Sequence, residues 1–441
     1  MTRVMATLHR HTLWLIAALA VGAYVAIYTI PLMDSPVRSD GLSYYVYLPF
    51  WVVYHDVSLE TVANRRFGGE FPGFSGLTRW PGTGRWVNPH PMGVAVLALP
   101  FYLVGDTLTR LLDYPAEGFS FFYRHSAGLA GAAYLVAGLF FLRRLLGRHF
   151  PPGVVLATLV CITFGTNLFH AGTFDCLWSH VYSFALVACL LDLVDCWHDQ
   201  PTTRQAVLVG LVVGLIALVR HANVVVAIFV VLYGVVDRAS LSSCARQFAA
   251  RSPQLALAAL VAAAVFAPQL ALYRWATGSW FIDPYAHVAA SQGGRAFDFL
   301  HPHLTAVLFS VRKGLCFWSP VLLLSVAGFF VMRGRIRRFR LPSIAVLAVT
   351  LYLIASWWDW QFGGSYGHRG FTDVLALFAL PMAALFQHAA SRPTVRLIVG
   401  TFAVMAVALS IAQMIQYWVG IIPYSDVTWD QYRSFFLRFS P

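Results

Sequence analysis

The chain is poor in charge and almost without lysine. Only 11% of its 441 residues are charged and 59% are hydrophobic, and Lys313 is its one lysine. An average soluble domain has about a quarter charged residues. This composition excludes an ordinary soluble enzyme and predicts an all-α polytopic membrane protein. The net charge of +12 does not indicate nucleic acid as a partner, because the arginines lie between apolar runs, as membrane-flanking charges do.

Several catalytic and metal-binding patterns are also missing. The sequence has no glycine-rich phosphate loop and no HExxH pair, and its six cysteines lack metal-ligand spacing. His301 and His303 flank a proline, so the two rings do not share one helical face for zinc. We therefore predict that no metal site and no cofactor are required, with a divalent cation left open.

Eleven apolar runs predict membrane-spanning helices, because about 20 apolar residues cross a bilayer as a helix and their backbone groups must be satisfied internally. Since no small-residue cleavage motif follows the first run, we expect it to remain in the protein. The predicted spans lie near residues 13–33, 122–142, 153–171, 177–197, 205–221, 222–237, 253–275, 315–332, 341–358, 371–388 and 396–417.

The segment 91–112 is apolar as well, but Pro100 interrupts it, and Asp106 and Arg110 lie in its last turns. If it does not cross the membrane, the basic N-terminus and all the basic connections between later spans face the cytoplasm. If it crosses, those connections all face outward. The positive-inside rule favours the first topology. We therefore predict that 91–112 lies in the outer interface, with the N-terminus inside and the C-terminus outside.

This topology gives one membrane domain over residues 1–441 with no separate soluble domain. Its long outer loops cover 34–121 and 276–314, and the inner connections are short and basic. The first loop is expected to carry interfacial helices. One of them is predicted over 42–56, because tyrosine and tryptophan are dense there and favour the headgroup level.

Asp40 stands alone just ahead of this aromatic segment. It is either the N-cap of the interfacial helix, in competition with Ser39, or a functional acid. Other isolated charges also fall on the outer loops, among them Asp175 and Arg369. A carboxylate can deprotonate an attacking hydroxyl, and cations can stabilise a departing phosphate. The competing interpretation of the cations is that they anchor anionic lipid headgroups.

Four stretches carry a family resemblance. They are "SDGLSYYVYLP" with Asp40, the proline-rich "NPHPMGVAVLALPFYLVGD", "YRHSAGLAG" with Arg124, and a second acid, Asp175, in the next outer loop. In this order they resemble the GT-C superfamily of membrane glycosyltransferases, whose members include protein O-mannosyltransferases, aminoarabinose transferases and oligosaccharyltransferases. The stretches "GLVVGLIALVRHAN", "LFSVRKGLCFWSPVLLL" and "WWDWQFGGSYGHRG" are similar to parts of bacterial members.

The resemblance implies an inverting transferase that moves a sugar from a polyprenyl-phosphate donor to a hydroxyl of a glycan, glycolipid or protein. It places the enzyme in the cytoplasmic membrane among membrane lipids, with its site on the outer face. Asp40 and Asp175 take the catalytic positions. The implied substrate-binding and lipid-phosphate-binding residues are Arg369, Lys313, Arg312, Arg220, His180, Arg124, Tyr44 and Tyr45.

Two departures from the family and two alternative functions stay open. Asp40 is followed by Gly41, where many relatives have a second acid, and the large outer domain of some relatives is missing. A ligase or polymerase of lipid-linked glycans would share the chemistry with an oligosaccharide donor. A lipid or glycan transporter would need no chemical step. The paired halves and broken helices typical of transporters are not evident in the sequence, however. Release of polyprenyl phosphate would separate enzyme from transporter.

Overall fold

The computed structural model describes residues 2–30, 32–283 and 296–438. In this part of the chain the named strands form a single antiparallel hairpin of β1 (Thr78–Arg79) and β2 (Trp86–Val87). The other regular elements are helices, which confirms the predicted all-α fold class. Of the predicted outer loop 276–314, residues 284–295 lie outside the described residues.

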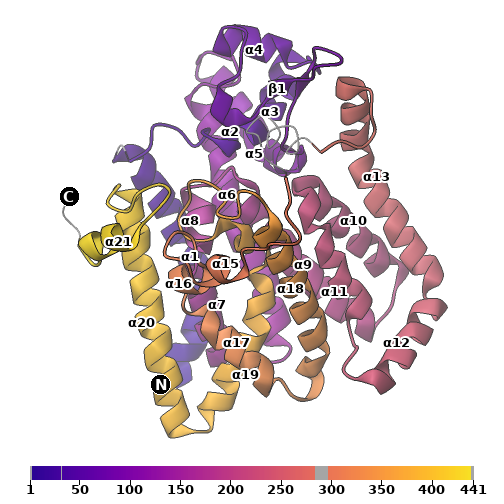
Figure 1. Cartoon of the computed structure of the whole chain (residues 1–441), viewed down its shortest axis with the longest axis vertical. Coiled ribbons are helices and arrows are strands. Elements are labelled where there is room, and N and C mark those ends of the chain that lie inside the picture. Colours follow the sequence, from indigo (N-terminus) through magenta and orange to yellow (C-terminus); the bar gives the residue numbers. More distant parts are fainter. Residues whose placement is uncertain (1, 31, 284–295, 439–441) are drawn as a thin grey trace.

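Long helices run side by side and form a bundle (Figure 1). Its main helices are α1 (Thr2–Thr29), α6 (Phe121–Gly147), α7 (Pro152–Phe164), α9 (Ser179–Asp199), α10 (Thr203–Val219), α13 (Ser252–Thr277), α17 (Leu322–Val331), α18 (Arg340–Ser356), α19 (Ala376–Ala390) and α20 (Pro393–Trp418). Shorter helices connect them: α8 (Leu168–Thr173), η3 (His221–Val226), α11 (Ala227–Leu232), α12 (Arg238–Ala250), α15 (Leu304–Phe309), α16 (Leu315–Trp318), η4 (Gly334–Phe339), η5 (Arg369–Val374) and α21 (Trp429–Phe435).

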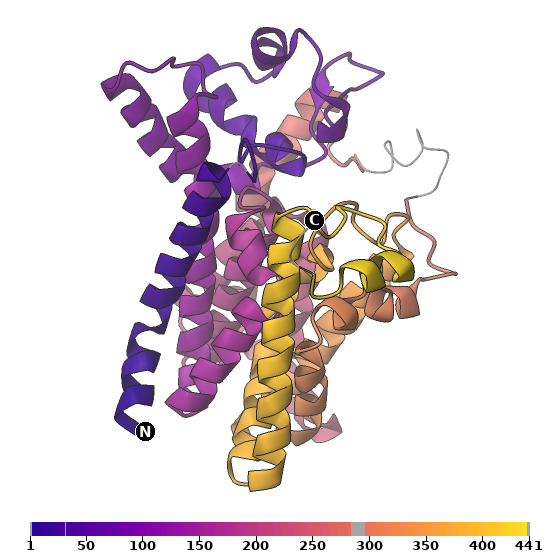
Figure 2. The ribbon, with the colours of Figure 1, turned by 90° about the vertical axis from the view of Figure 1, so that its left-hand side faces the viewer.

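The first predicted outer loop forms a cap beyond one end of the bundle. Figure 2 shows α1 and α20 running along the bundle, with the cap stacked past their upper ends. The cap consists of α2 (Asp40–Tyr45), α3 (Tyr47–Pro49), η1 (Phe50–Tyr54), α4 (Glu60–Phe67), η2 (Gly73–Ser75), the hairpin and α5 (Gly93–Leu111).

Apolar helices occur at each of the eleven predicted spans. Seven helices in the described residues are long and apolar enough to cross a membrane by themselves, and α5 is one of these seven. Five more apolar helices are shorter, with 10–17 residues. The number of helices that cross therefore stays a prediction, as does the single domain over 1–441.

Helix α5 packs at the end of the bundle. A side chain at Gly93 would clash with the backbone of Leu218 and Val219, where α10 ends. Farther along, a Cβ at Gly105 would lie 2.7 Å from the Phe122 carbonyl oxygen, where α6 begins. Helix α5 thus runs from the end of α10 toward the first turn of α6. Whether it crosses the membrane stays a prediction, since α5 is long and apolar enough to do so.

Small residues let neighbouring helices approach closely. Gly210 and Gly214 of α10 face α13 so tightly that a Cβ at either would press on the backbone of Ala258 or Ala262. Gly328 of α17 meets the backbone of Pro381 in α19 in the same way. Glycine at such contacts is typical of membrane helices, where close van der Waals packing replaces hydrophobic burial as the driving force.

The tyrosines on which the interfacial prediction for 42–56 depended do not face a headgroup layer, and the position of this segment relative to the membrane stays a prediction. The segment is helical, but Tyr44, Tyr45 and Tyr47 are buried inside the protein. The Tyr45 hydroxyl donates to the Gly118 carbonyl at 2.7 Å, and the Tyr47 hydroxyl donates to the His90 carbonyl at 2.9 Å. Buried tyrosines need such partners. Here the rest of the cap supplies them, so the aromatic side chains build the interior of the cap.

The N-cap interpretation of Asp40 is wrong. Asp40 is the first residue of α2, and Ser39 occupies the cap position with φ of 48° and no side-chain capping hydrogen bond. The Asp40 carboxylate is bonded to Arg369 instead. A capping oxygen must turn back to the helix's own N–H groups, and the pull of the guanidinium holds this one away from them.

We predict that single cysteines on a cysteine-free background will map the topology. Phe74 in the cap is 64% exposed and Asp430 in α21 has a 96% exposed side chain, so a membrane-impermeant thiol reagent should label Phe74→Cys and Asp430→Cys from outside. Arg335→Cys, at the opposite end, should react only after the membrane is opened. Labelling of position 335 in intact cells would overturn the predicted orientation.

Candidate active site

An ion pair joins the cap to the far part of the chain. Arg369 Nη1 donates to Asp40 Oδ2 at 2.7 Å, across 329 residues of sequence. The two side chains are 14% and 26% exposed. Burial alone would raise the pKa of Asp40, but Arg369 and His90 outweigh it and hold that pKa below its usual value. Asp40 is therefore an ionised carboxylate with some access to solvent.

A second buried acid, Asp175, lies between two partners. Arg38 Nη2 donates to Asp175 Oδ1 at 2.8 Å, and His170 Nε2 lies 2.8 Å from Asp175 Oδ2. Trp418 donates its indole N–H to His170 Nδ1, so the hydrogen of a neutral His170 is on Nε2 and points at the carboxylate. Burial opposes ionisation, yet His170 and Arg38 bring the pKa of Asp175 down to about 2.

Trp178 links these two ion pairs. The Arg369 guanidinium carbon lies 4.3 Å from the centre of the Trp178 ring system, and the Arg38 guanidinium carbon lies 6.0 Å from it. Both distances suit cation–π contacts. The indole therefore holds two guanidinium groups of like charge near each other, which would repel without it and without the two acids.

Three buried donors in this group have no acceptor among the described residues: Arg38 Nε, Arg369 Nε and Trp178 Nε1. Buried N–H groups are almost always hydrogen-bonded, and leaving one unpaired costs about 1–3 kcal/mol. The two guanidinium N–H groups and the indole N–H are thus unpaired within one group of contacting residues, and a ligand with several acceptor oxygens would supply the partners they lack. A phosphate has this chemistry.

A third acid, Asp373, lies in η5 beside these pairs. Its carboxylate contacts His180 Nδ1 at 2.7 Å, Asn223 Nδ2 at 2.8 Å and Arg220 Nη1 at 3.3 Å. The Arg220 side chain is 24% exposed, whereas Asp373 is fully buried. Asp373 thus fixes a guanidinium that also lies over the Phe362 ring, 4.9 Å from its centre.

Tyr44 and His90 line the space between this third acid and Asp40. The two rings pack edge to face, with centres 4.6 Å apart. Burial raises the pKa of Tyr44, and the charges of Arg220, Asp40 and Asp373 also act on it. Burial likewise lowers the pKa of His90 to about 4, so the His90 ring is neutral near pH 7.

Lys313 lies under the loop that carries Arg369. The side chain is 3% exposed, and Nζ donates to the carbonyls of Ser365 and, at 3.3 Å, Tyr424. Its pKa falls to about 7, first because burial disfavours the ammonium and second because Arg369 is near. Lys313 therefore joins the glycine-rich loop to the chain that follows α20.

The structure brings most, but not all, of the predicted site residues together. Asp40, Asp175, Arg369, Arg220, His180, Tyr44 and Lys313 form one connected group, called the outer cluster below. Arg312 is outside it, on the surface, paired with the exposed Asp426. Tyr45 packs against Tyr102 and Phe119 in the cap interior. Arg124, at the start of α6, has no ion pair with the cluster among the described residues.

Sequence reasoning missed several members of the outer cluster: Arg38, His90, His170, Trp178, Asn223 and Asp373. Three of them carried a signal in the sequence. His170 and Asp373 fall within predicted spans, and an ionisable side chain inside a span is by default a functional candidate. Arg38 also had one, because an arginine on an outer loop runs against the positive-inside rule.

This fold, a helical bundle with a cap beyond one end, is similar to the fold of a solved oligosaccharyltransferase. The first comparison is with the oligosaccharyltransferase of Archaeoglobus fulgidus in the apo form, at TM-score 0.50 and 14% identity over 98% of this chain. The same enzyme tethered to an acceptor peptide matches 99% of the chain at TM-score 0.48 and 13% identity. The likeness confirms the fold expected from the family resemblance.

The chain spans 60% of the length of that archaeal enzyme in both structures. No protein-family model and no curated protein matches the chain.

We predict that Lys313 makes stability depend on pH. Because the pKa of Lys313 is about 7 in the folded protein and about 10.5 when unfolded, the unfolded chain binds more protons between these values. Stability should therefore rise from pH 7 to pH 9. Lys313→Met should remove this rise, changing the difference in melting temperature between the two pH values by about 2 °C or more. Tryptophan fluorescence of the detergent-solubilised proteins measures the melting temperature at each pH. An identical pH dependence of the melting temperature in wild type and variant would contradict the prediction.

Proposed function

We propose that this protein is an inverting glycosyltransferase of the cytoplasmic membrane. It moves a sugar from a polyprenyl-phosphate donor to a hydroxyl of a glycan, glycolipid or protein at the outer face. The observation that carries the proposal is the Asp40–Arg369 pair, set beside three unpaired buried donors at the capped end of a GT-C fold. The reaction needs a base and a phosphate-binding group close together, and these residues supply both.

Asp40 is the general base in this proposal. It takes the proton of the acceptor hydroxyl while the acceptor oxygen bonds to the anomeric carbon and the bond from that carbon to the phosphate oxygen breaks. An ionised carboxylate is required, and the charges around Asp40 keep it ionised. Arg369 orients the carboxylate through Nη1 and keeps Nε for another partner.

The leaving group is the lipid phosphate, on which negative charge grows as the bond breaks. Arg369 and Arg38 both contact Trp178, and each has an unpaired Nε–H group that can donate to a phosphate oxygen. In this arrangement Asp175 is a positioning residue, because it holds Arg38. Arg220 and His180, fixed by Asp373, complete the wall on the other side of Asp40.

Asp40 and Asp175 of the outer cluster already have side-chain partners. Arg369 lies against Asp40, and Arg38 and His170 use both oxygens of Asp175. Among the described residues no three histidine, cysteine or acidic side chains form a group that could hold a metal ion. We therefore assign base and phosphate stabilisation to protein side chains, and a divalent cation at Asp175 would have to displace Arg38 or His170.

The structural likeness to an oligosaccharyltransferase supports a second candidate, transfer of an oligosaccharide from a lipid-linked donor. Both candidates share the base and the leaving group, so one assay addresses them. Purified protein is incubated with polyprenyl-phosphate donors carrying a monosaccharide or an oligosaccharide. Polyprenyl phosphate, or polyprenyl diphosphate for a diphosphate-linked donor, is then measured. If neither donor yields free polyprenyl phosphate or diphosphate, and the intact lipid moves across the membrane of vesicles, the result would support a transporter instead.

We predict that Asp40→Asn cuts the transfer rate by about 10²-fold or more, because the amide keeps the shape of the side chain but cannot accept the proton. Asp430→Asn, a neutralisation of an exposed acid on the same side, serves as the matched control. The rate of lipid phosphate release is measured for both. Near wild-type turnover by a folded Asp40→Asn protein would remove Asp40 from the catalytic role.

A second prediction separates the charge of Arg369 from its shape. A guanidinium can hold Asp40 with one nitrogen and phosphate with another, which a single ammonium cannot do. Arg369→Lys and Arg369→Ala should therefore both lose activity, by roughly 10- to 10³-fold. Arg433→Ala, which removes an exposed cation with a 75% exposed side chain, is the control. If Arg369→Lys and Arg369→Ala both turn over at near wild-type rates, Arg369 is a headgroup anchor.

A further inference from the structure

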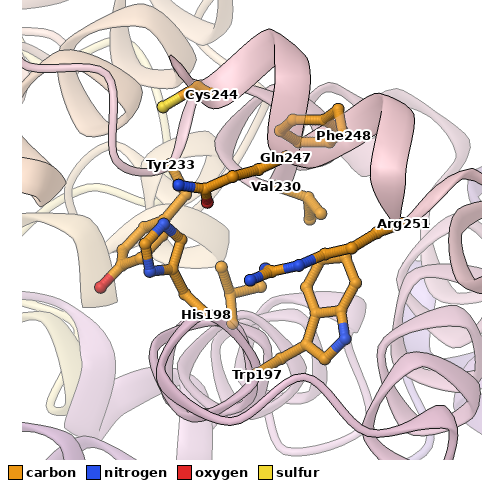
Figure 3. Close-up of a pocket in the computed structure, with 9 residues that line it drawn as sticks. Trp197, His198, Val230, Tyr233, Cys244, Gln247, Phe248 and Arg251 are labelled. Atoms are coloured by element: carbon orange, nitrogen blue, oxygen red, sulfur yellow. The ribbon is translucent and has the colours of Figure 1, made fainter. Parts of the chain in front are cut away.

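A small pocket lies at the end of the bundle opposite the cap, far from the outer cluster. It forms where the ends of α9 and α11 meet α12 (Figures 1 and 3). Figure 3 shows the Arg251 and Gln247 side chains reaching from α12 and its end into the space beside Trp197 and His198. Val230 and Phe248 supply its apolar wall. A cation and an amide thus enter a pocket with an aromatic floor.

Arg251 is a cation without a carboxylate partner in the described part of the chain. Its guanidinium carbon lies 5.6 Å from the centre of the Trp197 ring system. The nearby acids are already used: Asp199 pairs with Arg335 and Arg338, and Asp195 is bonded to Arg148, His149 and Tyr233. A guanidinium that stacks on an indole but has no carboxylate partner can donate hydrogen bonds to an anion.

The size of the pocket restricts what enters it. Its volume is about 20 Å³, which suits about one water-sized group. One phosphate oxygen fits at the bottom, next to Arg251, while the remainder of a larger anion stays at the mouth. The pocket is therefore unsuited to a whole nucleotide or sugar, and suited to the phosphate of a molecule that is held by something else.

The surroundings identify that molecule as a membrane lipid. Helix α13 begins directly after Arg251, is long and apolar enough to span a membrane, and has only Gln269, Tyr273, Ala276 and Thr277 buried. Leu241 of α12 is 54% exposed, so α12 also presents apolar surface beside the pocket. Acyl chains can lie along these helices while the headgroup reaches Arg251. The arginines of α12 and η4 favour an anionic lipid over a zwitterionic one.

We propose that Arg251, with Trp197 and Gln247, forms a binding site for the phosphate headgroup of an anionic membrane lipid at the uncapped end of the bundle. This site does not depend on the proposed transferase activity. The indole keeps the guanidinium in place, the amide of Gln247 supplies a further donor, and the exposed apolar faces of α12 and α13 hold the lipid chains.

Native mass spectrometry of the full-length protein in detergent, titrated with phosphatidylglycerol or phosphatidylcholine, tests the proposal. Wild type should bind phosphatidylglycerol more tightly than phosphatidylcholine. Arg251→Ala should weaken phosphatidylglycerol binding about tenfold, as expected for loss of a charge-assisted hydrogen bond. Arg246→Ala removes the same charge from an exposed position on the same helix and should change affinity less than about twofold. Arg251→Gln keeps a long side chain for packing and should weaken binding like Arg251→Ala.

Equal losses in Arg251→Ala and Arg246→Ala would mean diffuse attraction to basic surface and would overturn the site. Equal binding of the two lipids by wild type would overturn its anionic specificity. Inorganic phosphate is the third arm. If phosphate alone binds at Arg251 and phosphatidylglycerol gains nothing over it, the lipid assignment is wrong. If Arg251→Ala does not fold, the Arg251→Gln titration decides.

Discussion

Charges that are buried where a membrane bundle meets its cap must be paired, and the Asp40–Arg369 bond is the pair on which the rest of the outer cluster depends. It fixes the first turn of α2 to the first turn of η5. Its guanidinium also contacts Trp178, which Arg38 contacts as well. Without the carboxylate, a guanidinium that is 14% exposed would lose its ion-pair partner beside a second cation at the same indole. Desolvation and repulsion would then both act against the closed arrangement.

Gly41, the residue after Asp40, lies against the Trp178 indole. A Cβ at position 41 would lie 3.2 Å from Trp178 Cδ1, a contact tighter than ordinary packing. The indole occupies the space that a second acidic side chain would need. The same indole contacts the Arg369 guanidinium, so a larger residue at position 41 would disturb that contact as well.

Local features of the sequence were sufficient to predict the fold but only part of the site. Hydropathy depends on residues that are neighbours in the chain, so the eleven apolar runs and the apolar 91–112 segment could be predicted from the sequence. Asp40, Asp175 and Arg369 could be singled out as well, because they lie near the ends of these runs. The aromatic density of 42–56 was misleading, because tyrosines suit a headgroup layer and a protein interior equally well. Only the Gly118 and His90 carbonyls, distant in sequence, decide between them. The partners of Asp373 were unreadable for the same reason: its nearest contact in sequence is 150 residues away.

The charges of the outer cluster do not cancel, and this imbalance bears on what it binds. Its acids are Asp40, Asp175 and Asp373, and its cations are Arg38, Arg220, Arg369 and Lys313, so four positive groups face three negative ones when Lys313 is protonated. Lys313 is the member whose charge changes most readily near neutral pH, because its pKa is about 7 and the proximity of Arg369 helps to lower that pKa. A phosphate held by Arg369 would reverse that effect, since an anion near a buried amine favours the ammonium. Ligand binding and protonation of Lys313 are then coupled. The protonated Lys313 holds the carbonyls of Ser365 and Tyr424 more strongly, so phosphate binding would tighten the loop that carries Arg369 around its own ligand.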